Sequence, residues 1–216
     1  MEKFVDGQKV AELFNLLIDG GVKFALLRNF NNEIPDKLSV DKDIDIIVNP
    51  DDLKLLRTIL KKNKWKEVRH PWDFGNNFVF LYSMNSFLFY RKDGISLDIC
   101  FQLCCRSLNR GEWFPLDEAI QVSVWENRKE VSDVWRYELS NEDYLIHLIT
   151  RSIFDKKKFT ENYIQAIESV LHFTDKMKVK AKLEVVFFKF TDTLIDCIYS
   201  KEYNSIVNRY ITFSDY

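Results

Sequence analysis

The chain has 216 residues, with 31 Lys and Arg against 33 Asp and Glu and a formal net charge of −2. Hydrophobic residues make up 46% and charged residues 30%, which excludes disorder as the main state and fits one domain or two small ones. The near-neutral balance also argues against a dedicated nucleic-acid-binding protein, which normally carries a basic excess.

Three further absences narrow the class of protein. No apolar run approaches the length of about 18 residues that a membrane-spanning helix requires. The first residues lack the basic-then-apolar order of a signal peptide, and the four cysteines show neither a CxxC pair nor zinc spacing. We therefore expect a cytoplasmic protein with reduced cysteines and no membrane partner.

The first half of the chain predicts an α/β unit. Apolar residues at helical spacing predict a helix over 5–19, which Gly20 and Gly21 end. Apolar and β-branched runs predict strands over 22–28 and 44–48. Asn49 can cap the next helix, which has Pro50 at its first position and runs to about residue 62. Three more strands are predicted over 79–83, 87–91 and 95–103, so that helices flank a small mixed β-sheet.

The second half of the chain predicts helices. Residues 140–143 form a capping box that opens a helix through about residue 154, and further helices are predicted over 160–174 and 179–199. No glycine follows Gly111 and no proline follows Pro115, which suits helical sequence. The lysine runs at 156–158 and 176–182 are expected to be solvated faces rather than a nucleic-acid-binding surface. We predict an α/β domain over 1–139 and a helical C-terminal domain over 140–216, packed together.

Three aspartates stand on apolar strands, where charge is unexpected. Alternation places Asp43 and Asp45 on one face of their strand, and Asp98 lies between apolar residues of a later strand. Carboxylates that share a face repel each other and resist desolvation, and a hard cation such as Mg²⁺ relieves both costs. Asp41 alternates with the first pair, but Lys42 breaks the apolar pattern there, so we prefer Asp43 and Asp45. A turn or a surface pair with lysine is the alternative role for such residues.

These residues resemble a known family. The strand that includes Phe24, the polar loop after it, the Asp43-Ile44-Asp45-Ile46 run and the later Leu97-Asp98-Ile99 are similar to the nucleotidyltransferase fold of the DNA polymerase β superfamily. The nearest branch is that of bacterial nucleotidyltransferase-like proteins. The resemblance covers roughly residues 5–154 as a pattern, and the three acids are its specific part.

The resemblance implies an enzyme that transfers a nucleoside monophosphate from an NTP to the hydroxyl of a small sugar, alcohol or phosphate acceptor. It implies that Asp43 and Asp45 ligate two Mg²⁺ ions, with Mn²⁺ as the alternative, in a site of the kind used for nucleotidyl transfer. Asp98 would ligate the catalytic ion and help to deprotonate the acceptor hydroxyl. NTP and a small molecule are thus the expected partners, and nucleic acid is not.

The chain departs from the family at the turn after its first strand. The family has Gly-Ser there, so that backbone N–H groups can approach the triphosphate. This chain has Arg28 and Asn29, which become the candidate phosphate-binding residues. Two alternatives stay open: a nucleotidyltransferase-like binding protein without catalysis, and an enzyme of the antitoxin type that nucleotidylates a protein or tRNA.

Other polar residues are candidates for contacts with the acceptor or with phosphate. His70 could line an acceptor pocket, and an exposed loop histidine is the alternative. Arg151 could reach a phosphate over the sheet, or form a surface ion pair with Asp155 four residues later. His147, on the apolar helix, is expected to be a core or interface histidine. Trp72 and Trp113, which lie beside polar loop residues, are candidates for stacking on a base or a sugar.

Overall fold

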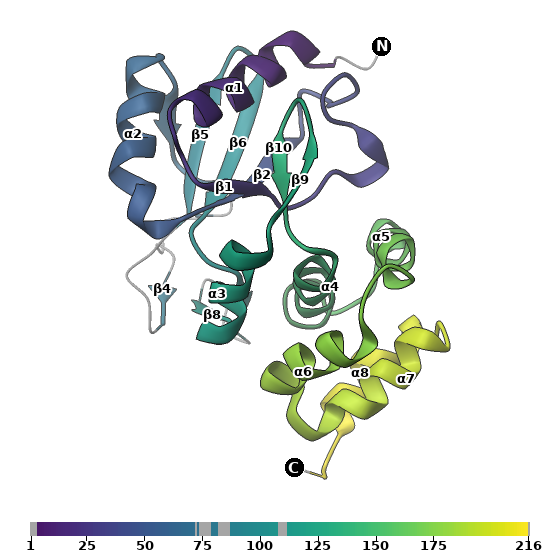
Figure 1. The fold of residues 1–216 in the computed structure, drawn as a ribbon. Coiled ribbons are helices and arrows are strands. Elements are labelled where there is room, and N and C mark those ends of the chain that lie inside the picture. The colour runs from purple at the N-terminus through teal and green to yellow at the C-terminus, as the bar shows by residue number, and fades with distance from the viewer. Residues whose placement is uncertain (1–3, 72, 74–78, 82–86, 108–111, 216) are drawn as a thin grey trace.

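The computed structural model describes residues 4–71, 73, 79–81, 87–107 and 112–215. A mixed β-sheet flanked by helices occupies the N-terminal part of the molecule, and helices make up the C-terminal part (Figure 1). The predicted fold class is therefore confirmed. Among the described residues, no helix combines the length and the apolar character needed to cross a membrane.

The elements are as follows. The strands are β1 (Phe24–Leu26), β2 (Asp43–Val48), β3 (Lys66–Val68), β4 (Val79–Phe80), β5 (Leu88–Lys92), β6 (Ile95–Cys100), β7 (Cys104–Arg106), β8 (Glu112–Pro115), β9 (Lys129–Ser132) and β10 (Arg136–Glu138). The α-helices are α1 (Gly7–Asp19), α2 (Leu53–Lys62), α3 (Glu118–Asn127), α4 (Asn141–Thr150), α5 (Glu161–Leu171), α6 (Lys176–Phe187), α7 (Thr191–Tyr199) and α8 (Tyr203–Thr212). Short 3₁₀ turns cover Phe30–Asn32, Pro50–Asp52 and Phe188–Phe190, and a π-helical segment covers Arg151–Lys156.

The main sheet has the strand order β3-β5-β6-β2-β1-β10-β9. Strand β2 runs parallel to β6 and β1 runs parallel to β10, while the other neighbours are antiparallel. The described part of the strand predicted over 79–83 does not join this sheet. Its described part, β4, pairs with β8 in a small sheet of order β4-β8-β7, and residues 82–83 lie outside the described residues, as does Trp72.

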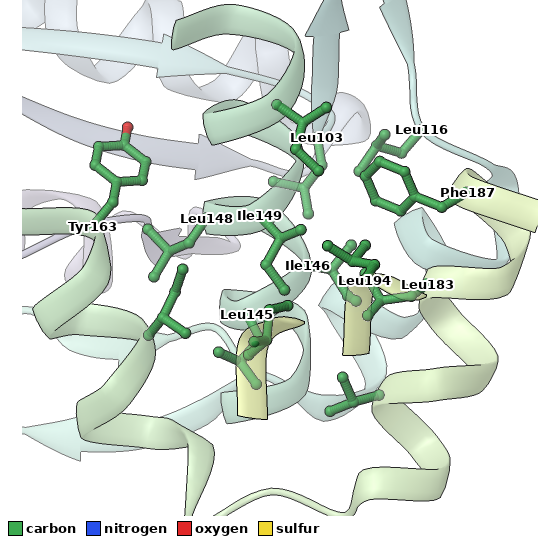
Figure 2. Close-up of a cluster of buried hydrophobic side chains, with 14 of the residues drawn as sticks. Leu103, Leu116, Leu145, Ile146, Leu148, Ile149, Tyr163, Leu183, Phe187 and Leu194 are labelled. Carbon is green, nitrogen blue, oxygen red and sulfur yellow. The ribbon is translucent and has the colours of Figure 1, made fainter. Parts of the chain in front are cut away.

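Two buried cores hold the elements together. Strand β2 points Ile44, Ile46 and Val48 into a core that also contains apolar residues of α1 and α2. A second core joins the C-terminal helices to the sheet through Ala25, Leu27 and other side chains. Figure 2 shows the centre of this second core; its labelled residues are Leu103, Leu116, Leu145, Ile146, Leu148, Ile149, Tyr163, Leu183, Phe187 and Leu194. The domain boundary at 139/140 stays a prediction, and both sides of it contribute to this core.

Two of the predicted helix starts agree with the structure because polar side chains satisfy the first N–H groups there. The Asn49 side-chain oxygen accepts a hydrogen bond from the Asp51 N–H at 3.0 Å, and a 3₁₀ turn then leads into α2. The Ser140 hydroxyl accepts one from the Asp143 N–H at 3.1 Å at the start of α4. Helix α1 ends at Gly20, as expected.

Two predictions about the C-terminal helices are wrong in detail. The helix predicted over 179–199 is broken at Phe188, whose φ of 49° lies outside the helical region, so α6 and α7 are separate. Helix α8 was not predicted. The lysine run on α6 is also not wholly solvated, because Lys182 pairs with the fully buried Asp143.

Candidate active site

The three aspartates meet at the centre of the main sheet. Strands β2 and β6 are parallel and in register, so Asp45 lies directly opposite Asp98, while Asp43 lies two pairs earlier, opposite Ser96. One potential ligand atom from each of the three acids lies within 4.8 Å of the others. Since Ile44 on β2 and its alternates fill the core on the other face, the acids share the face opposite α1 and α2.

The charge of Asp43 is unfavourable where it stands. Partial burial of its carboxyl raises the pKa of Asp43, and the nearby Asp45 and Asp98 carboxylates raise it further. Three carboxylates gathered around one point form the oxygen-ligand set that hard divalent cations prefer. The donor set therefore fits a divalent metal, as the sequence predicted.

Replacing Asp43 with Asn should stabilise the metal-free chain at neutral pH. Folding raises the Asp43 pKa, so the folded chain holds this proton more tightly than the unfolded chain, and ionisation at neutral pH costs stability. The gain in Asp43→Asn should shrink as the pH falls toward the ordinary pKa of 3.8, where the carboxyl becomes neutral in both states. Urea denaturation in the presence of a chelator, at several pH values, measures the difference in the free energy of unfolding between the variant and the wild type.

Asp41→Asn is the matched control for this experiment. The Ser39 hydroxyl donates a hydrogen bond to Asp41 and lowers the pKa of that carboxyl. The same substitution should therefore remove stability at neutral pH rather than add it. If both variants changed the free energy of unfolding in the same direction, the account of charge repulsion among the three acids would be wrong.

Arg28 connects the acids to the C-terminal helices. Its guanidinium, just after β1, forms an ion pair with Asp45 and donates a hydrogen bond to the Tyr163 hydroxyl on α5 at 2.7 Å. Burial lowers the pKa of Arg28, but Asp45 and Tyr163 outweigh this effect and raise it, so the guanidinium stays charged. A cation therefore lies beside the acids at the place where the sequence predicted a phosphate contact.

Arg151 approaches the same hydroxyl from the helical side. Its Nε donates to the Tyr163 oxygen at 3.3 Å, and its Nη1 lies 3.5 Å from an Asp155 carboxylate oxygen. The predicted pair with Asp155 is thus present, but it is buried rather than on the surface. Arg151 opens the π-helical segment, a geometry that often occurs at functional sites.

Tyr163 was not predicted as a site residue, and it contacts both arginines. Figure 2 shows its hydroxyl pointing away from the other labelled side chains of the core. Burial raises the pKa of Tyr163, but the two guanidinium groups of Arg28 and Arg151 outweigh burial and lower it. No local pattern could have found this residue, because its partner Arg28 is far away in the sequence.

His70 lies against the third acid. Its Nε2 is 3.3 Å from a carboxylate oxygen of Asp98, and its side chain is only 9% exposed. The ring centroids of Phe87 and Phe89 lie 5.6 and 5.4 Å from the His70 ring centroid and hold it in place. The alternative of an exposed loop histidine is therefore wrong, and the role of His70 in an acceptor pocket stays a prediction.

Asn29 and Asp41 are directed elsewhere. The Asn29 amide accepts a hydrogen bond from the Ile34 N–H at 2.9 Å and donates to the Ile34 carbonyl at 3.4 Å, so it shapes the loop after β1. Its phosphate-binding role stays a prediction. Asp41 bonds to Ser39 and is not among the clustered acids.

A small hollow lies between the acids and α4. Among the residues that line it are Asp45, Asp98, Cys100, His147 and Arg151. Burial and the nearby Asp98 and Asp45 charges raise the pKa of Cys100 to about 12, so its thiol is protonated at neutral pH. Burial, together with Arg151 and Arg28, keeps the pKa of His147 well below its usual value, so this buried histidine is neutral. Its predicted place in the core is confirmed.

The comparisons with known proteins give structural matches only. No protein-family model matches the chain, and no curated protein matches it. The chain is similar to the lincomycin-bound lincosamide antibiotic adenylyltransferase LnuA, with 14% identity, a TM-score of 0.46, and 80% of this chain and 100% of that one covered. It is also similar to the antibiotic-resistance factor ANT(2'')-Ia, with 8% identity, a TM-score of 0.49, and coverage of 91% and 100%.

A third solved structure is an antigenic nucleotidyltransferase-like protein from Paracoccidioides brasiliensis. It shares 15% identity with this chain at a TM-score of 0.45, over 93% of this chain and 95% of that one. All three TM-scores lie below 0.5, so these likenesses carry no argument about function.

Proposed function

We propose that the protein is a divalent-metal-dependent nucleotidyltransferase that transfers a nucleoside monophosphate from an NTP to a hydroxyl of a small-molecule acceptor. The observation that carries the proposal is the convergence of Asp43, Asp45 and Asp98 on the face of two neighbouring parallel strands. This arrangement costs the apo protein electrostatic energy, and two metal ions would recover it.

The metal-binding role belongs to the three acids. Asp43, Asp45 and Asp98 would hold Mg²⁺, with Mn²⁺ as the alternative, and the ions would supply positive charge to the phosphates and to the attacking oxygen. Asp98 would also accept the proton of the acceptor hydroxyl. His70, which contacts the Asp98 carboxylate and is packed between Phe87 and Phe89, would fix the orientation of that carboxylate.

The phosphates of the NTP would be bound by arginine in place of the missing Gly-Ser turn. Arg28 is charged and lies against Asp45, at the edge of the cluster of three acids. Arg151 lines the adjoining hollow and shares Tyr163 with Arg28. Guanidinium groups suit this role because their N–H groups match phosphate oxygens in pairs.

Calorimetric titration with each NTP, with and without Mg²⁺, tests the proposal. The wild-type chain should bind at least one NTP only in the presence of the metal. Arg28→Met should weaken that binding about 10- to 100-fold, since a charged hydrogen-bonding partner of the phosphates is lost. Arg57→Met is the matched control, because Arg57 is exposed on α2 and pairs with Glu67.

The remaining outcomes separate the alternatives. The absence of metal-dependent nucleotide binding would contradict the proposal. If the chain binds an NTP but does not consume it with any acceptor in a panel of sugars, polyols and their phosphates, a binding protein without catalysis is favoured. Transfer of label from NTP to a protein or to tRNA would favour an enzyme of the antitoxin type.

A further inference from the structure

The face of the sheet that carries the acids also carries cations. Residues paired across neighbouring strands point to the same side, and one such row runs from Asp43 through Ser96 and Arg91 to Lys66. The next row on this face contains Asp45, Asp98 and Phe89. The acidic centre on β2 and β6 therefore passes into a basic strip on the adjoining strands β5 and β3.

Arg91 is held in a fixed place on this strip. Its guanidinium carbon lies over the Phe89 ring, 5.5 Å from the ring centroid. Phe89, which is 3% exposed, packs edge-on against His70, and His70 contacts Asp98. A stacked guanidinium keeps its N–H edge available for an anion. Arg91 is thus joined by two ring contacts and one polar contact to the proposed catalytic carboxylate.

The surroundings of Arg91 carry an excess of positive charge. It forms no ion pair with any residue that the structure describes, and the like-charged Lys66 lies directly opposite it on β3. Lys64 and Lys92 line the same surface hollow. The acids of that hollow are Asp41 and Asp93, so four cations face two carboxylates there. Like charges on directly opposite residues are unfavourable, and a bound anion removes that cost.

The position of Arg91 relative to Asp98 limits the ligand. Phe89 is paired with Asp98, so Arg91, two residues further on, is a diagonal neighbour, at a typical separation of about 7–8 Å. A molecule with a hydroxyl at Asp98 and an anionic group at Arg91 spans a chain of a few carbon atoms. Short phosphorylated alcohols have these dimensions.

We infer that Arg91, supported by Lys66, binds a phosphate group of the acceptor, and that the acceptor is a small phosphorylated alcohol rather than a neutral or cationic one. The role of this molecule as acceptor rests on the proposed function, whereas its binding at Arg91 does not. The terminal phosphates of the NTP carry the same chemistry, and the experiment has to distinguish the two sources.

The test uses calorimetric titrations of the full chain with glycerol 3-phosphate, with glycerol, and with each NTP in the presence of Mg²⁺. We expect glycerol 3-phosphate to bind and glycerol not to bind. Arg91→Met should weaken the binding of glycerol 3-phosphate about 10- to 100-fold, as expected for the loss of a charge-assisted hydrogen bond. It should leave NTP binding unchanged. Lys54→Met, which removes an exposed cation on α2, is the control and should change neither.

Two results would overturn the inference. One is that glycerol 3-phosphate binds no better than glycerol, and the other is that Arg91→Met weakens the binding of NTP instead of that of glycerol 3-phosphate. The Asp43→Asn variant separates this inference from the proposed function. It should lose metal-dependent NTP binding and keep glycerol 3-phosphate binding. If Asp43→Asn left NTP binding unchanged while Arg91→Met still weakened glycerol 3-phosphate binding, the proposed function would be contradicted. The inferred phosphate site at Arg91 would then still stand.

Discussion

Replacement of Asp98 by Asn should abolish nucleotidyl transfer and leave the fold in place. Asn has nearly the same shape and can still bond to His70, but it neither accepts the acceptor proton nor supplies negative charge to the metal. Loss of a general base alone costs about 10²–10⁴-fold, so we expect a fall of at least about 10³-fold when metal binding is also weakened. Transfer of label from an α-labelled NTP measures this, with circular dichroism as the check on folding.

Two further variants calibrate that result. Asp43→Asn should lose transfer to a similar degree, since Asp43 belongs to the same cluster. Asp41→Asn alters an aspartate at the same alternation that lies outside the cluster and bonds to Ser39, so it should keep its activity. Full activity in Asp98→Asn, or equal losses in the Asp41 and Asp43 variants, would show that the acids are not the catalytic centre.

The largest effect on stability is expected from Lys182→Met. The Lys182 Nζ lies 2.5 Å from a carboxylate oxygen of Asp143, which is fully buried and also bonds to Ser123 and Ser140. Met fills similar space but leaves the carboxylate without its cation. Breaking a buried pair in this way costs about 3–5 kcal/mol, and the hydroxyl groups that remain favour the lower value. A fall in Tm of roughly 6–12 °C should follow for a chain of this length.

Lys180→Met provides the comparison, because it removes a neighbouring lysine of the same helix. Lys180 pairs with the exposed Asp192 at 2.6 Å, where water can replace the lost partner. The Tm of the Lys180→Met variant should therefore stay close to that of the wild type. Equal losses in the two variants would mean that the Asp143 network contributes nothing beyond a surface ion pair.

The acids could be predicted because their signal is local. Asp43 and Asp45 alternate on an apolar strand, and Asp98 interrupts another one, so the sequence predicted both the shared face and the chemistry. The helix caps at Asn49 and Ser140 could be predicted for the same reason, since a cap depends on residues within one turn.

The rest of the site depends on contacts between distant residues. Tyr163 belongs to α5, and neither its spacing nor its neighbours indicate a bond to Arg28. His70 lies two residues after β3, and only the folding of the sheet brings it to Asp98, Phe87 and Phe89. Arg91 was not predicted as a site residue, because a single arginine at an exposed position of a short strand is common.

Several strands were missed for a related reason. Strands β9 and β10 expose part of every side chain, so no clear alternation of apolar and polar residues marks them. Strand β3 has three residues, of which two are exposed. Such strands form because a neighbour offers hydrogen bonds, and sequence within the strand carries little of that information.

The sheet order also governs how the chain can fold as it is synthesised. Strand β1 is wholly buried, and its partner on one side is β10, which leaves the ribosome only after most of the sheet has been made. Until then β1 has an open edge of unpaired N–H and C=O groups between apolar side chains, the kind of edge that pairs with other chains. A nascent chain stopped before β10 is therefore expected to need a chaperone, whereas the finished chain closes that edge itself.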